Sequence, residues 1–128
     1  MKKLKENCKI AVVQGAPVLF DKGRGVEKVI EFIKESSKNG AELIVFPELF
    51  IPGYPYGMTF GFTVGSRKEY GRIDWKRYYD NSIVIPGPET EKISQVVKEV
   101  KAYVSIGVSE RDLESATLYN LSLIHIWR

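Results

Sequence analysis

Short apolar runs alternate with longer amphipathic segments along this chain, and that alternation restricts the fold more than any other feature. Residues 9–14 (K-I-A-V-V-Q), 42–46 (E-L-I-V-F) and 103–109 (Y-V-S-I-G-V-S) are short runs rich in β-branched residues. Such runs are typical of strands that a parallel sheet buries on both faces. A fourth strand is predicted over residues 116–124.

Two of the intervening segments have the i, i+3, i+4, i+7 apolar spacing of an amphipathic helix. The helix predicted over residues 25–38 carries this stripe at Val26, Val29, Ile30 and Ile33, and the helix predicted over residues 89–102 carries it at Ile93, Val96, Val97 and Val100. A βαβ order of this kind predicts an α/β fold, with a mostly parallel sheet and both helices on one face. The 128 residues have room for one such domain.

The composition argues against several classes of protein. No apolar stretch approaches the roughly 20 residues that cross a bilayer, and no leader peptide is recognised, so we expect a cytoplasmic protein without a membrane partner. The net charge is +3 and basic residues alternate with acidic ones, so no nucleic-acid partner is predicted. A single cysteine and a single histidine argue against an internal disulfide and a metal centre, and no cofactor is expected.

The segment from residue 50 to about residue 72 is rich in glycine, proline and aromatic residues. This composition predicts a long ordered loop, and such loops tend to be functional. A short helix is predicted after it, over residues 72–81. The aromatic residues of this loop near residue 48 are Tyr54, Tyr56, Phe60 and Phe62. They either line a substrate pocket or pack to shield the core or a subunit interface.

Glu48 follows the second predicted strand, at the edge where α/β sheets form ligand crevices. We expect its neighbours Phe46, Pro47, Leu49 and Phe50 to shield it partly from water. Shielding raises the pKa of a carboxyl group and makes it a better base near neutral pH. Position alone also allows a solvated loop acid or a helix cap.

Several separated motifs resemble one family, in the same order. F-P-E-L-F-I-P-G-Y-P-Y-G, residues 46–57, resembles the signature around the catalytic glutamate of the nitrilase superfamily of carbon–nitrogen hydrolases. T-F-G-F-T-V-G-S-R and Y-D-N-S-I-V-I-P-G-P-E-T-E resemble the nitrilase branch in particular, and I-A-V-V-Q-G-A-P-V, I-G-V-S-E-R-D and T-L-Y-N match it too. The resemblance covers about residues 9–120, and several motifs in register are a specific signal.

The resemblance implies an α-β-β-α sandwich, of which this chain is the N-terminal portion, and a Glu-Lys-Cys catalytic set. In that chemistry a cysteine thiolate attacks the nitrile carbon to form a thioimidate. Water then releases ammonia and leaves a thioester, and a second water gives the carboxylic acid. By motif match, Glu48 is the general base that accepts protons and Tyr54 is a candidate substrate-binding residue. A small nitrile is the implied substrate, and a homo-oligomer the implied full-length assembly.

The family's lysine and cysteine motifs are missing from this sequence. The lysine belongs to a K-x-x-K-x-x-P-T segment after the T-L-Y-N strand and the cysteine to a C-W-E context, and neither occurs in the 128 residues. Lys92, Lys98 and Lys101 belong to the polar face of the second helix, and Cys8 precedes the first strand. None of these is expected to substitute. The chain is therefore interpreted as a truncated nitrilase that is inactive alone.

The last eight residues, L-S-L-I-H-I-W-R (121–128), read either as a truncated end or as a translated sequencing adapter. His125 and Trp127 are therefore given no function. Two alternatives to the nitrilase interpretation stay open. One is another hydrolase of the superfamily, a cyanide hydrolase or an aliphatic amidase. The other is a non-catalytic α/β interaction module.

Three structural expectations follow from the resemblance. Because the second sheet of the sandwich is largely absent from these residues, one face of the sheet should be apolar and exposed, with poor solubility as a consequence. Glu48 should lie at the carboxyl ends of the parallel strands, facing a concavity. It should also lack a strong ion pair, because a nearby cation lowers the pKa of a carboxyl group and with it its basicity.

Overall fold

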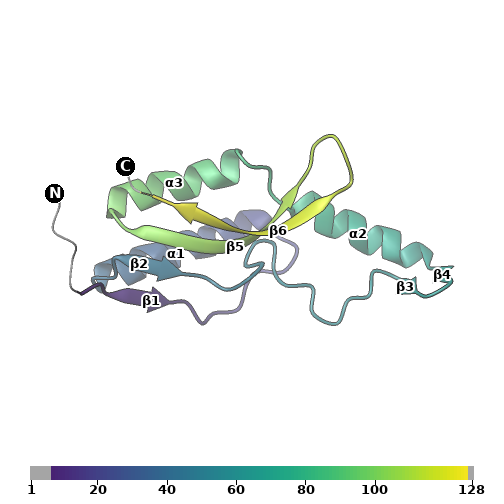
Figure 1. Cartoon of the computed structure of the whole chain (residues 1–128), viewed down its shortest axis with the longest axis horizontal. Helices are drawn as coiled ribbons and strands as arrows, with labels where there is room; N and C mark the ends of the chain where they lie inside the picture. Colours follow the sequence, from purple (N-terminus) through teal and green to yellow (C-terminus); the bar gives the residue numbers. More distant parts are fainter. Residues whose placement is uncertain (1–6, 127–128) are drawn as a thin grey trace.

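The computed structural model describes residues 7–126, and they form a four-stranded sheet with two helices against it (Figure 1). The strand order is β1 (Ile10–Val12), β2 (Leu43–Val45), β5 (Tyr103–Arg111) and β6 (Leu118–His125). β1, β2 and β5 are parallel, and β6 pairs antiparallel to β5. The predicted α/β class with a parallel-centred sheet is therefore confirmed.

Helices α1 (Lys22–Lys38) and α3 (Pro88–Val100) pack against each other and cover one face of the sheet (Figure 1). Their predicted stripes meet strand residues in the core, where Val29, Ile33 and Ile93 are fully buried with Ile44 and Ile106. Burial of each such side chain stabilises the fold by about 1.5–3 kcal/mol. Both helices lie on one face, as the βαβ order predicts.

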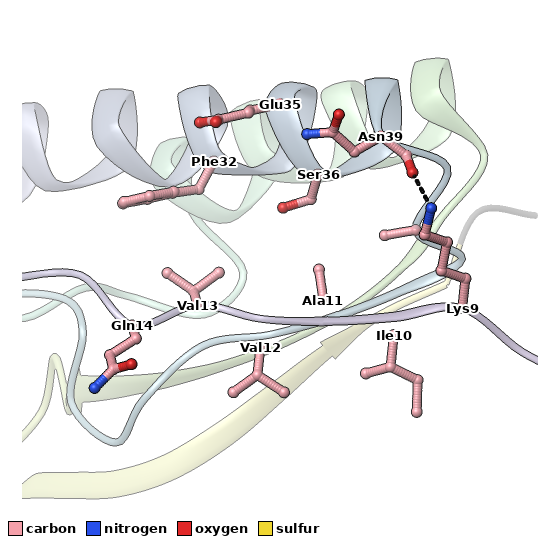
Figure 2. A pocket seen from close by; sticks show the side chains of 11 residues that line it. Lys9, Ile10, Ala11, Val12, Val13, Gln14, Phe32, Glu35, Ser36 and Asn39 are labelled. Carbon is pink, nitrogen blue, oxygen red and sulfur yellow. Dashed lines mark hydrogen bonds between the residues drawn. The ribbon is translucent and has the colours of Figure 1, made fainter.

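The opposite face of the sheet, which we call the open face, is left uncovered by the described chain at β1, at the start of β5 and at the end of β6, whereas residues 47–49 and Ser82 lie over Gly107 and Ser109 of β5. Ile10 and Val12 are 54% and 77% exposed. Figure 2 shows Ala11 and Val13 pointing toward α1 while Ile10 and Val12 point away from it. The prediction that these strands are buried on both faces is therefore wrong for β1, because helices cover only one side. The predicted exposed apolar face is confirmed, and Tyr103 and Ile124 are exposed as well.

The predicted loop contains more regular structure than expected. A two-residue hairpin, β3 (Phe62–Thr63) with β4 (Ser66–Arg67), interrupts it. Helix α2 (Glu69–Asn81) begins three residues before the expected residue 72. Figure 1 shows β3, β4 and α2 extending beyond the end of the main sheet. We call residues 59–81 the arm.

Helix α1 begins three residues before its predicted start at residue 25, and its N-terminal cap explains the difference. Asp21 caps the helix by accepting a hydrogen bond from the backbone N–H of Arg24 at 2.9 Å, so the helix begins at Lys22 and not at residue 25. At the other end Asn39 caps the helix and Gly40 has a positive φ of 85°, as the Asn-Gly pair predicts. Within residues 7–126, no helix has the length and apolar character that crossing a membrane would require.

Candidate active site

The chain bulges out of the sheet directly after β2, and Glu48 lies in that bulge. The backbone N–H of Phe46 donates to the Ser105 carbonyl at 2.8 Å, and the N–H of Phe50 donates to the Gly107 carbonyl at 2.7 Å. The three residues between them, 47–49, do not pair with β5 and loop outward. Leu49 adopts a positive φ of 47° in the bulge.

Gly107 on β5 gives the bulge its space. A Cβ at Gly107 would lie 2.5 Å from the Pro47 carbonyl oxygen and 2.6 Å from the Cα of Glu48. Real Cβ contacts are never this short, so any side chain at this position would displace the backbone of Glu48. Glycine is therefore the residue that lets the Glu48 backbone rest against the sheet.

The Glu48 carboxylate reaches the open face of the sheet. Asn120 of β6 donates from Nδ2 to Glu48 Oε1 at 2.5 Å. Asn120 is the register partner of Ser109, and directly opposed residues of an antiparallel pair point to the same face. Ser109 alternates with Val108, which lies in the core under the helices. Asn120 and the carboxylate that it binds therefore lie on the side away from α1 and α3.

Part of the expected environment of Glu48 is wrong. The residue is exposed, and it is not among the lining residues of the five best-defined hollows of the described part of the chain. The expected shielding fails because Phe46 and Phe50 turn to the helix side, where their rings pack edge-to-face with Phe32 of α1. The expected position at the carboxyl end of β2 is correct. Among the side chains that the structure describes, none forms an ion pair with Glu48.

Tyr78 of α2 is a neighbour of Glu48 that the sequence did not reveal. Its side chain is 4% exposed, and its hydroxyl donates to the Gly53 carbonyl at 3.1 Å. The pKa of the Tyr78 phenol is raised to about 12, mainly by burial; a hydrogen bond with Ser109 lowers it, and the nearby Tyr54 and Glu48 raise it. Tyr78 therefore connects α2 to the loop between Glu48 and Tyr54.

A pair of buried hydroxyls supports this connection. Ser82 Oγ lies 2.9 Å from the Tyr78 carbonyl oxygen and 2.9 Å from Ser109 Oγ. Both serines are almost fully buried, at 0% and 2% exposure. Buried polar groups that satisfy one another hold a structure in one arrangement. The end of α2, the strand β5 and the loop after Glu48 are thereby fixed together.

The aromatic residues of the loop divide into two groups. Tyr54 lies near Tyr78 and is 51% exposed, so it is accessible. Phe60 packs edge-to-face on both Trp75 and Tyr78, with ring centroids 5.7 Å and 5.9 Å away, which favours the packing interpretation for this residue. Tyr56 and Phe62 are largely exposed and lie outside that stack.

The residues that the sequence excluded from catalysis lie away from Glu48 or on the surface. Cys8 is exposed before β1. Lys92, Lys98 and Lys101 are exposed on and just after α3. No group of three metal-binding side chains is found among the described residues.

His125, to which no function was assigned, has a structural position at the end of β6. Its side chain is 6% exposed, its Nδ1 lies 2.9 Å from Ser94 Oγ, and burial lowers its pKa. Trp127 lies outside the described residues.

Comparison with known proteins gives a consistent family. The family described as carbon-nitrogen hydrolase matches residues 9–125. An aliphatic nitrilase of Sinorhizobium fredii (strain HH103) is 44% identical over 113 residues, which are 88% of this chain and 36% of that protein. Nitrilase 2 of Arabidopsis thaliana is 40% identical over 112 residues, which are 88% of this chain and 32% of that protein. The chain thus spans about a third of the length of these relatives.

Solved structures share the fold at lower identity. A CN-hydrolase superfamily protein from Xanthomonas campestris, which has an arsenic adduct in its active site, aligns with a TM-score of 0.65 and 17% identity over 96% of this chain and 38% of that one. A glutamine-dependent NAD+ synthetase from Acinetobacter baumannii aligns with a TM-score of 0.58 and 21% identity over 94% of this chain and 19% of that one. At these identities the likeness concerns the fold.

Proposed function

Because this chain belongs to the carbon–nitrogen hydrolase family, we propose that it serves nitrile hydrolysis and that Glu48 is its general base. Nitrilases are among the curated relatives that match it, at 36–44% identity. The observation that carries the assignment is the state of the Glu48 carboxylate. A neutral amide, Asn120, holds it on the open face, and no cation of the described chain pairs with it.

The Glu48 carboxylate is exposed on the open face, so a thiol or a water brought to that face can reach it. In the proposed reaction Glu48 takes the proton of a cysteine thiol, the thiolate sulfur bonds to the nitrile carbon, and Glu48 passes the proton to the nitrile nitrogen to give a thioimidate. Glu48, again a carboxylate, next takes a proton from water as the water oxygen bonds to the thioimidate carbon, and it returns this proton to the nitrogen. The C–N bond breaks, ammonia leaves, and a thioester remains. A second water, activated in the same way, releases the carboxylic acid and restores the thiol.

The reaction also needs a thiol and a cation that the described residues do not bring to Glu48. The family motifs that carry them are not found within the 128 residues. The contribution that we assign to this chain is therefore the base, its backbone support at Gly107 and the amide of Asn120. Tyr54 is the residue that we propose for substrate contact, since it is exposed and both it and Glu48 lie near Tyr78.

The test places this chain in a complete enzyme. Residues 9–125 replace the matching segment of the Sinorhizobium fredii aliphatic nitrilase, and ammonia release is measured with an aliphatic nitrile and with the corresponding amide. Glu48→Gln keeps the shape of the side chain and removes the base, so nitrile turnover should fall by about 10²–10⁴-fold.

Glu31→Gln, on the exposed surface of α1, makes the same change of charge and should leave turnover unaltered. Near-normal turnover of the Glu48→Gln chimera would show that the carboxylate is structural. A chimera that cleaves the amide and not the nitrile would instead assign the site to an amidase.

We also propose that the functional protein is a cytoplasmic homo-oligomer. The exposed apolar side chains of the open face and of the arm support association with further protein surface. Cell fractionation and the native mass of the chimera test the two statements separately. A membrane-bound or exported protein would contradict the first, and a monomeric active chimera the second.

A further inference from the structure

The arm contains a hollow of its own. It lies between residues 59–62 and the first turns of α2, and its volume is about 430 Å³, within the range of small-ligand sites. Three aromatic side chains, those of Phe60, Phe62 and Trp75, make up the apolar part of its lining. Glu48 is not among the lining residues, so the hollow is separate from the proposed base.

The floor of the hollow is fixed by backbone contact between the loop and the helix. A Cβ on Gly71 would lie 1.8 Å from the Phe60 carbonyl oxygen, and one on Gly61 would lie 2.9 Å from the Cα of Gly71. The N–H of Lys68 donates to the Gly61 carbonyl at 3.3 Å. The two segments are therefore in contact without intervening side chains, which gives the hollow a defined shape before any ligand binds.

The charged groups of the hollow are both cationic. Lys68 and Arg72 line it, no aspartate or glutamate does, and neither cation makes an ion pair within residues 7–126. The hollow between β1 and α1 differs, because its Lys9 already donates to the Asn39 carbonyl at 2.6 Å (Figure 2). The hollow of the arm thus combines aromatic walls with two cations that remain available.

We propose that this hollow binds a small carboxylate that carries an aryl group. The ring would contact Trp75 and Phe62, which are 39% and 69% exposed and so are accessible. The carboxylate would accept hydrogen bonds from Arg72, whose guanidinium matches its geometry, and attract Lys68. This inference goes beyond the proposed function and is consistent with that function. A nitrile is neutral, whereas the carboxylate that its hydrolysis produces carries the negative charge that the two cations of the hollow would attract.

Fluorescence of Trp75 reports binding to the 128-residue chain. The chain has two tryptophans, so Trp127→Phe makes Trp75 the sole tryptophan, and excitation at the red edge of the absorption band avoids the tyrosines. The probes are 3-phenylpropionate, the neutral 3-phenylpropionamide, and acetate, which has the charge without the ring. Phenylpropionate should give a saturable change and bind at least about tenfold more tightly than the amide or acetate.

The variant that tests the charge is Arg72→Gln, which should weaken phenylpropionate binding about tenfold and leave amide binding unchanged. Lys76→Gln removes the same charge from the same helix at a residue that does not line the hollow. It should have no effect, and Glu48→Gln should have none either. The inference would be overturned if phenylpropionate gave no saturable response, or if it bound no more tightly than the amide or acetate. It would also be overturned if Arg72→Gln and Lys76→Gln had equal effects on phenylpropionate binding.

Discussion

Gly107→Ala tests whether the sheet supports the Glu48 bulge as the structure indicates. The added Cβ would lie 2.5 Å from the Pro47 carbonyl oxygen, 2.6 Å from Glu48 Cα and 2.6 Å from the Leu49 nitrogen. Ordinary van der Waals contact begins at 3.4 Å. Because all three neighbours are backbone atoms, no side-chain rotation relieves the clash, and the bulge must move outward by nearly 1 Å.

The cost follows from this displacement. Overpacking a filled site costs about 1–3 kcal/mol, and a clash with three backbone atoms belongs at the upper end, about 3 kcal/mol. For a chain of 128 residues, each kcal/mol lowers the melting temperature by about 4 °C, so a drop of about 12 °C is expected. Circular dichroism of the variant and the parent chain measures it. In the nitrilase chimera the same change should also lower turnover, because Glu48 moves with its backbone.

Gly23→Ala in α1 is the matched control. Its Cβ would meet only Asp21 Oδ1, at 3.5 Å, so no clash arises. Alanine is favoured over glycine by about 0.8–1 kcal/mol in a helix interior and by less in the first turn, where Gly23 lies, so this variant should melt at or slightly above the parent temperature. If Gly107→Ala melted within about 2 °C of the parent, the backbone would not lie against Gly107, and the geometry of the bulge would be refuted.

Three further outcomes are expected. Tyr78→Phe leaves the Gly53 carbonyl without its partner and should cost about 1 kcal/mol in denaturant unfolding; an unchanged free energy of unfolding would contradict the contact. Burial lowers the pKa of His125 below 6.5, so the unfolded chain binds the proton more readily, and stability should be lost as pH falls below that value. His125→Gln should reduce the difference in melting temperature between about pH 8 and pH 5. If the variant and the parent showed the same difference, His125 would be excluded as the cause of the pH dependence. Val12→Thr on the open face should reduce binding of a hydrophobic dye with little loss of stability, whereas Ile44→Thr in the core should unfold the chain; equal effects would contradict the one-sided sheet.

Most of the fold could be predicted because its elements depend on local periodicity. The valine and isoleucine stripes of α1 and α3 predict amphipathic helices with one face packed on a sheet. The β-branched runs predict strands β2 and β5. The errors lie at boundaries and at burial. Asp21 extends α1 by a capping bond that periodicity does not register, and Val12 is exposed because burial depends on what covers the strand.

Less of the site could be predicted. Glu48 was identified by its motif and by its place after β2, but its contacts come from distant parts of the chain. Asn120 is 72 residues away, and Tyr78 reaches Gly53 across 25 residues. No local sequence pattern predicts either contact. The first depends on the register of β6 on β5, and the second depends on the position of α2. In the sequence Tyr78 stands beside Tyr79, and nothing local shows which of the two is buried.

The exposure of Glu48 and the exposure of the apolar sheet face have a common cause. The side chains next to Glu48 in sequence turn toward α1, so they cannot exclude water from the carboxylate on the other side of the sheet. Any surface that covers the open face would bury Val12 and Ile124 and would also remove water from Glu48 and Asn120. Desolvation penalises the charged form of a carboxyl group and strengthens it as a base. A surface that buries the exposed apolar side chains of the sheet would therefore also strengthen Glu48 as a base. Burial of the open face and activity of the base should appear together in any assembly that covers this face.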